Sequence, residues 1–470
     1  MKSLRHHRRL VRAIAALGDS TNGRILRAAV TVAGLASFVK VASLAKEMLI
    51  ARRFGAGDAL DAFYVAVLLP GFLSGVIASS FNAAFLPTYI ELRETAGRVA
   101  AQRLVSNVSA LALVGLVAVC LLLGLSERWV LPLLGSGFQP DKLKLARLLF
   151  FVLLVSIVLG GLGSFWRSLL TAHDCFALTA LAPIMNPLII LAVLLTVRNS
   201  WGIYALTGGV ILGELGELSI SGSALRLRGI ALFPRWHGFD GPIRHVLAQT
   251  VPVLAGALLL GCSTLIDQAM AAMLGAGSLS ALNYSNKLLS VILSIGVTSL
   301  SVAILPSFSR LSAKEDWAAI RHVLVTYTGL IALVTVPLTI FLMIFSEPLV
   351  ALFFKGGAFT SRDVHIVSQV QTLLCLQLPF CAISILYVNA ICSFKRNHIL
   401  MWGTGISIVT NLILNLVFMR LFGLPGIALS TSVVYLISCC YLGFMCFRSI
   451  GQREANVAAS YTVALANSAI

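Results

Sequence analysis

Residues 34–61 begin with a strongly apolar run that nevertheless carries charged side chains. Lys40, Lys46 and Glu47 fall inside this stretch, and Asp61 opens the next apolar run. A charge inside a lipid bilayer costs roughly 2.5–3.5 kcal/mol on insertion scales, so such charges are rarely retained without a function. Lys40 and Glu47 are seven residues apart and therefore lie nearly on one helical face. This pattern predicts the wall of a polar cavity.

Membrane-spanning helices must position these residues. Of the 470 residues, 58% are hydrophobic and only 11% are charged, with a mean hydropathy of +0.94. Soluble domains carry about 25% charged residues, so this composition excludes a water-soluble fold. The net charge of +17 falls between apolar runs rather than on a basic patch, and we expect no nucleic-acid partner. We therefore predict an all-α polytopic membrane protein.

Twelve spans are predicted from the apolar runs, each about 20 residues or longer. They cover 28–51, 62–90, 104–125, 146–170, 177–197, 202–220, 246–273, 280–308, 323–345, 365–392, 399–419 and 424–447. The nine cysteines lie in or at the ends of these runs without CxxC spacing. We interpret them as small buried side chains and expect no metal site.

Lysine and arginine are unevenly distributed between the spans. With the N-terminus inside, 22 of the 35 fall in the tails and inner loops, ten in outer segments and three within spans. Because positive residues are enriched on the cytoplasmic side, both termini are predicted to be cytoplasmic. The predicted organisation is a basic cytoplasmic tail (1–27), a six-helix lobe (28–225), a cytoplasmic linker (226–245), a second six-helix lobe (246–448) and a short cytoplasmic tail (449–470).

The chain also repeats itself. Residues 51–87 align with 271–306, and both segments contain a Gly-Ala-Gly turn and close on Leu-Pro. At the same offset of 220 residues, Glu47 falls on Asp267. Six spans in each half give the two halves the same orientation, which is expected of a transporter that rocks between two states. Two hairpins that merely share a turn are the alternative.

Lys287, in the second span of the second half, could join Lys40 and Lys46 around one cavity. Lysine is a strongly hydrated point charge that suits phosphate. The alternative is that each lysine extends to a membrane interface, an alternative that is strongest for Lys46.

The acidic residues have alternative roles as well. Asp61 could cap the second helix or take part in gating or ion coupling. Glu47 and Asp267 could pair with the lysines or bind a coupling cation. Glu214, together with Glu217, could close a cytoplasmic gate against arginines.

Enzyme signatures are absent from the sequence. It contains no P-loop lysine motif, HExxH or GxSxG, and its two longest outer loops offer little for a glycosyltransferase. We therefore expect a transporter rather than an enzyme. It would need no cofactor and would be driven by a coupling ion (Na⁺ or H⁺) or by the membrane potential.

At these residues the chain resembles the MurJ/MviN lipid II flippase family of the multidrug/oligosaccharidyl-lipid/polysaccharide (MOP) exporter superfamily. The resemblance is strongest over 34–93 and 262–312. It includes an RxFGAG…DAF pattern, here Arg53 to Gly57 followed by Asp61 to Phe63. The resemblance implies two six-helix MATE-like lobes around a cationic cavity that opens alternately to each side. It also implies export of an undecaprenyl-pyrophosphate-linked saccharide across the bacterial inner membrane.

Single positions carry over in part. The family's first-helix arginines correspond to Lys40 and Lys46, and its eighth-helix arginine to Lys287, whereas the glutamate one turn later is Ser290. Two further C-terminal helices usual in the family have no counterpart after Arg453. The resemblance thus predicts a flippase for lipid II or for another polyprenyl-linked saccharide such as an exopolysaccharide unit. Proteins of cell-envelope synthesis are candidate partners, and a cation-coupled multidrug exporter is the alternative function.

Overall fold

The computed structural model describes residues 21–230, 232, 234–394 and 396–468. Within these ranges the chain is helical with short turns, and its only β-type pairing is an isolated bridge between Gly356 and Phe359. The predicted all-α class is therefore confirmed. The basic tail lies largely in residues 1–20, outside the described part. Continuous helices are expected of an apolar chain, because a backbone in lipid must satisfy its own hydrogen bonds.

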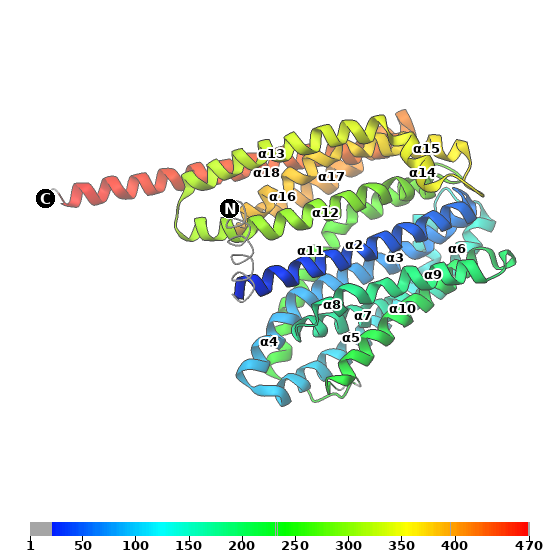
Figure 1. The fold of residues 1–470 in the computed structure, drawn as a ribbon, viewed down its shortest axis with the longest axis horizontal. Helices are drawn as coiled ribbons and strands as arrows, with labels where there is room; N and C mark the ends of the chain where they lie inside the picture. Colours follow the sequence, from blue (N-terminus) through cyan, green and yellow to red (C-terminus); the bar gives the residue numbers. More distant parts are fainter. Residues whose placement is uncertain (1–20, 231, 233, 395, 469–470) are drawn as a thin grey trace, which may run out of the picture. The chain divides into compact units, whose positions relative to one another are not determined.

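The chain divides into two compact units, described separately here (Figure 1). Unit 1 comprises Met1–Leu49, Leu69–Ser126 and Leu149–Leu254. Five α-helices lie wholly within this unit: α4 (Leu86–Thr95), α7 (Val155–Ala172), the short α8 (Phe176–Leu181), α9 (Met185–Thr196) and α10 (Gly202–Leu227). Helix α10 packs along both α7 and α9.

Unit 2 comprises Ile50–Leu68, Glu127–Leu148 and Ala255–Ile470. Its own helices are α12 (Ser278–Ala313), α13 (Trp317–Ile344), α14 (Ser346–Phe354), α15 (Ser361–Cys375), α16 (Gln377–Ser393), α17 (Asn397–Phe422) and α18 (Leu424–Ser468). Five helices contribute residues to both units, namely α2 (Thr21–Phe54), α3 (Asp58–Ser80), α5 (Gly97–Leu134), α6 (Pro140–Leu153) and α11 (Gly241–Ala272). The predicted lobe boundary at 226–245 stays a prediction.

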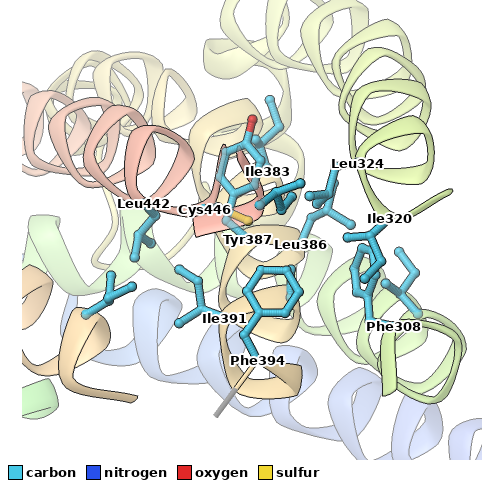
Figure 2. Packing of buried hydrophobic residues seen from close by; sticks show 14 of the residues in the cluster. Phe308, Ile320, Leu324, Ile383, Leu386, Tyr387, Ile391, Phe394, Leu442 and Cys446 are labelled. Carbon is cyan, nitrogen blue, oxygen red and sulfur yellow. The ribbon is translucent and has the colours of Figure 1, made fainter. Parts of the chain in front are cut away.

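Each unit has its own apolar core. In unit 2, side chains of α12, α13, α16 and α18 interdigitate around Phe308, Leu386 and Phe394, as Figure 2 shows. In unit 1, a second cluster gathers around Phe85 and Phe165, whose ring centroids lie 4.9 Å apart. Burial of such large side chains supplies about 1.5–3 kcal/mol each relative to exposure in water.

Ten helical segments among the described residues are long and apolar enough to cross a membrane. They coincide with predicted spans two to seven and nine to twelve. The predicted first and eighth spans fall within α2 and α12, which are 34 and 36 residues long but are not among the ten. The count of twelve stays a prediction.

The observed helices differ in detail from the predicted spans. The predicted span 62–90 consists of α3 and α4, joined by a π-helical turn at Phe81–Phe85. Helix α18 continues to Ser468 instead of ending near residue 447. Its last part is rich in alanine, which favours helix irrespective of hydropathy. The short α14 lies in a segment interpreted from sequence as a loop.

Candidate functional site

The carboxylate of Asp61, on α3, caps the N-terminus of α12. Its Oδ2 accepts a hydrogen bond from the backbone N–H of Gly277 at 2.7 Å, and its Oδ1 accepts from the backbone N–H of Ser280 at 2.8 Å. The Ser280 hydroxyl donates a further bond of 2.6 Å. Gly277 and Ser280 occupy the N-cap and third positions of α12. Two of the donors that a helix start leaves unpaired are therefore satisfied by another helix.

A lysine balances the charge of this cap. Lys142 Nζ lies 2.9 Å from Asp61 Oδ2 and 2.6 Å from Asp58 Oδ1. The Asp61 side chain is fully buried and that of Lys142 is 9% exposed, whereas Asp58 is 64% exposed. Asp61 thus caps α12, and not the second helix as one sequence interpretation had it. The predicted gating or ion-coupling role of Asp61 stays a prediction.

The contact between Asp61 and α12 joins equivalent parts of the internal repeat, because each partner lies at the start of a repeated helix. Helices α3 and α12 begin at Asp58 and Ser278, 220 residues apart, each directly after a Gly-Ala-Gly turn. Gly277 has φ +80°, and a Cβ there would lie 2.5 Å from the carbonyl oxygen of Ala56. Only glycine fits that conformation and that approach without strain. The turn therefore delivers the Gly277 N–H to Asp61.

Asp267, on α11, is the centre of a second polar cluster in unit 2. Its Oδ1 accepts hydrogen bonds from Asn411 Nδ2 at 2.9 Å and Asn415 Nδ2 at 2.6 Å, both on α17. Its Oδ2 accepts from Thr431 Oγ1, on α18, at 3.1 Å. Asn415 Oδ1 is buried and has no hydrogen-bond partner among the described residues. Three membrane helices therefore converge on one carboxylate.

These groups are hard oxygen ligands. A hard cation would suit the Asp267 carboxylate and the Thr431 hydroxyl, joined by the amide oxygens of Asn411 and Asn415 if the side-chain amides rotated. The carboxylate by itself could bind a proton. Asp267, Asn411 and Thr431 also line a cavity of about 680 Å³, together with hydroxyls such as Ser407. No group of three or more His, Cys, Asp or Glu side chains forms a metal site in the described part of the chain.

The three predicted substrate-binding lysines lie in both units. Lys40 and Lys46 are on α2 in unit 1, and Lys287 is on α12 in unit 2. Lys40 is exposed, whereas Lys46 Nζ pairs with Glu47 Oε1 at 3.1 Å. Glu47 therefore neutralises its neighbour, which is one of the two roles that the sequence left open. Assembly of the three lysines around one cavity stays a prediction.

Glu214 and Glu217 lie one turn apart on α10. Glu217 forms an ion pair with Arg167 of α7. The Oε2 atom of Glu214 is buried and has no hydrogen-bond partner among the described residues. The arginine partner expected for this acidic pair is thus present for Glu217, while the gating role of Glu214 stays a prediction.

Sequence reasoning missed Lys142, Asn411, Asn415 and Thr431. Lys142 counted only as an outer positive charge, although a buried aspartate requires a partner. Asn411 and Asn415 stand four residues apart in the apolar segment TNLILNL. Two amides on one face of a membrane helix were a signal that could have indicated a polar partner such as Asp267.

Comparison with known proteins places this architecture among transporters. The family model described as "Lipid II flippase MurJ" matches residues 50–469. The lipid II flippase MurJ of Burkholderia cenocepacia is 29% identical over 423 residues, which cover 87% of this chain and 81% of that protein.

Solved structures share the fold. A lipid II flippase MurJ in an inward closed conformation superposes with a TM-score of 0.77 at 22% identity, covering 92% of each chain. An inward-facing multidrug resistance MATE family transporter of the MOP superfamily superposes with a TM-score of 0.72 at 13% identity, over 90% of this chain and 95% of that one. The predicted MATE-like fold is thereby confirmed.

Proposed function

Because the chain belongs to the lipid II flippase MurJ family, we propose that it moves an undecaprenyl-pyrophosphate-linked saccharide of the lipid II type across the membrane by alternating access. The observation that carries this proposal is the family match, which extends over 50–469 and so includes nearly all of the helical chain. The similarity to the multidrug transporter, at 13% identity, supports the fold alone. A flippase is therefore favoured over a drug exporter, and transport over catalysis.

In this proposal Lys40, Lys46 and Lys287 contact the pyrophosphate, while the polyprenyl tail stays in lipid. Lys40 supports the idea most directly, because it is exposed on α2 and forms no ion pair with any described residue. The charge of Lys46 is already compensated by Glu47. Removal of Lys40 should therefore weaken binding more than removal of Lys46.

Asp267 is the carboxylate that we assign to ion coupling. Beside a cavity, its cluster holds the hydroxyl of Thr431 and the amides of Asn411 and Asn415, whose oxygen atoms would face the carboxylate if the amides rotated. Such a set of oxygen atoms fits Na⁺, and the carboxylate fits H⁺. An inside-negative potential would add a driving force of about 2.3 kcal/mol per charge per 100 mV for outward movement of an anion.

The proposed setting is the bacterial inner membrane with both termini in the cytoplasm, as the distribution of lysine and arginine favours. There the chain would receive its substrate from proteins of cell-envelope synthesis. An exopolysaccharide unit on the same polyprenyl pyrophosphate would satisfy the same lysines. The saccharide is therefore the part of the substrate that experiment must identify.

Binding of lipid II to the purified protein in nanodiscs tests the proposal. Lys40→Ala combined with Lys287→Ala should raise the dissociation constant roughly tenfold or more, because two charge-assisted contacts are lost. Lys355→Ala, which removes an exposed lysine, is the matched control. Unchanged binding by the double variant would remove the lysines from the substrate site. A preference for a polyprenyl pyrophosphate that carries a different saccharide would reassign the substrate.

A further inference from the structure

A strongly basic pocket lies in unit 1 and includes none of the residues assigned above to transport. Its volume is about 660 Å³, and it is formed by α4, the start of α5, the turn after α7 and the segment after α10. Five arginines line it: Arg93, Arg98, Arg103, Arg228 and Arg235. No aspartate or glutamate is among the lining residues in the described part of the chain.

Hydrogen bonds fix one wall of this pocket. Ser106 Oγ donates to the carbonyl oxygen of Arg235 at 2.8 Å and accepts from the Arg235 N–H at 2.6 Å. Asn107 Nδ2 donates to the carbonyl oxygen of Gly238 at 3.0 Å, and Asn107 Oδ1 accepts from the His237 N–H at 2.7 Å. Ser106 and Asn107 are buried on α5. Four hydrogen bonds therefore hold the segment after α10 against α5, so this wall of the pocket has a defined position.

Neutral groups hold two of the arginines in place. Arg93 Nη1 donates to the carbonyl oxygen of Ala172 at 2.9 Å, and Arg228 Nη1 donates to that of His173 at 3.0 Å. Arg93 also meets Glu94, but that carboxylate is 67% exposed and is largely solvated.

The other three arginines, Arg98, Arg103 and Arg235, form no ion pair with a described residue. The positive charge of the pocket is therefore mostly uncompensated.

The pKa of a histidine in the same pocket is affected by this positive charge. His173 Nε2 lies 2.8 Å from the hydroxyl oxygen of Tyr89. Burial lowers the pKa of His173, and the charges of Arg93, Arg228 and Arg98 lower it further. The part of this pKa shift that the arginines cause agrees with a positive potential in the pocket, which favours an anion.

We propose that this pocket binds a phosphate-bearing anion. Arginine presents a planar fork of donors that matches phosphate oxygens, and several arginines together match a group of more than one negative charge. The volume lies within the range of about 300–1,000 Å³ typical of small-ligand sites.

The phosphate could belong to the head group of an anionic lipid or to a soluble compound. Trp236 and Phe239 lie on the same segment as Arg235, are exposed, and stack edge to face with centroids 4.8 Å apart. Tryptophan is enriched at membrane interfaces, and basic pockets at that level bind lipid head groups.

Charges that only orient the protein in the membrane would need no pocket, because orientation depends on the side of the membrane and not on local geometry. This difference supplies a control. Arg310 and Lys314 are exposed at the C-terminal end of α12 and outside the pocket. Replacement of Arg310 and Lys314 removes two positive charges, as many as replacement of Arg98 and Arg103 removes.

The test measures phosphate binding by the full-length protein, purified in neutral detergent and freed of lipid. The probes are inorganic pyrophosphate and phosphatidylglycerol in phosphatidylcholine nanodiscs. Arg98→Gln with Arg103→Gln should weaken binding roughly tenfold or more, because charge-assisted bonds are lost. Arg310→Gln with Lys314→Gln should change it by less than about twofold, because an exposed charge outside the pocket makes no contact with the ligand.

The outcomes distinguish a lipid head group, a soluble ligand and the absence of a phosphate site. Selective binding of phosphatidylglycerol identifies a lipid head group, and selective binding of pyrophosphate identifies a soluble ligand. Equal loss in both double variants, or binding of neither probe by the wild type, overturns the proposal. Arg235→Gln, whose backbone bonds to Ser106 remain, gives the same test if the first double variant does not fold.

Discussion

Replacement of Asp61 by asparagine tests the cap on α12. Asparagine keeps the shape of the side chain and one acceptor oxygen, so two of the four bonds to the carboxylate can persist. If the amide NH₂ replaces Oδ2, the Gly277 N–H loses its acceptor and Lys142 keeps only the exposed Asp58. A buried unsatisfied donor costs about 1–3 kcal/mol, and a broken buried ion pair about 3–5 kcal/mol. Because Asp58 still pairs with Lys142, we expect a loss of about 3 kcal/mol in the free energy of unfolding.

Asp58→Asn is the matched control. Asp58 lies on the same helix and contacts the same lysine, but it is 64% exposed, so its replacement should cost at most about 1 kcal/mol. The free energy of unfolding is measured for both variants by denaturant titration in one detergent, followed by tryptophan fluorescence. Equal stability of the two variants would refute the cap as a stabilising contact. Wild-type stability of Asp61→Asn with loss of transport would instead assign Asp61 to gating.

Three further changes have defined outcomes. Gly277→Ala should lower the free energy of unfolding by about 1–3 kcal/mol, because the new Cβ would meet the carbonyl oxygen of Ala56. Gly256→Ala is the control: a Cβ at Gly256 would meet no other atom, so this change should be neutral or stabilising in the same denaturant titration. Burial and neighbouring arginines lower the pKa of His173, so the fold is most stable where this side chain is neutral, at pH above about 6.5, and loses stability as the pH falls towards the pKa of the folded state. His173→Gln should therefore flatten the decline in the free energy of unfolding between about pH 7 and pH 5. An unchanged decline would exclude His173 as its source. Asp267→Asn should abolish any dependence of transport on Na⁺ or on a proton gradient while the protein stays folded, and retention of that dependence would place the coupling site elsewhere.

The helical architecture could be predicted from sequence because its causes are local. A membrane helix satisfies its backbone within its own residues, so apolar runs indicate the spans without knowledge of the neighbours. The repeat also predicted a shared helix start, and α3 and α12 begin at Asp58 and Ser278, at the offset of 220 residues. Where hydropathy is not decisive, as at the end of α18, the sequence missed the extent of the helix.

The partners of the buried carboxylates could not be predicted in the same way. Asp61 meets Ser280, which is 219 residues away, and Asp267 meets Asn411, 144 residues away. Such contacts depend on helix packing, which hydropathy does not encode. The sequence identified which acidic residues needed an explanation, since a charge in a membrane helix is costly. It could not decide between a structural cap and a coupling site. The structure shows that Asp61 caps α12, whereas the coupling roles of Asp61 and Asp267 stay predictions.

The most direct measurement of the central claim is rescue of bacteria depleted of their own lipid II flippase. Wild-type protein should restore growth and the appearance of lipid II on the outer face of the membrane, and Lys40→Ala combined with Lys287→Ala should not. Failure of the wild-type protein, with its presence in the membrane established, would contradict the assignment of lipid II as substrate.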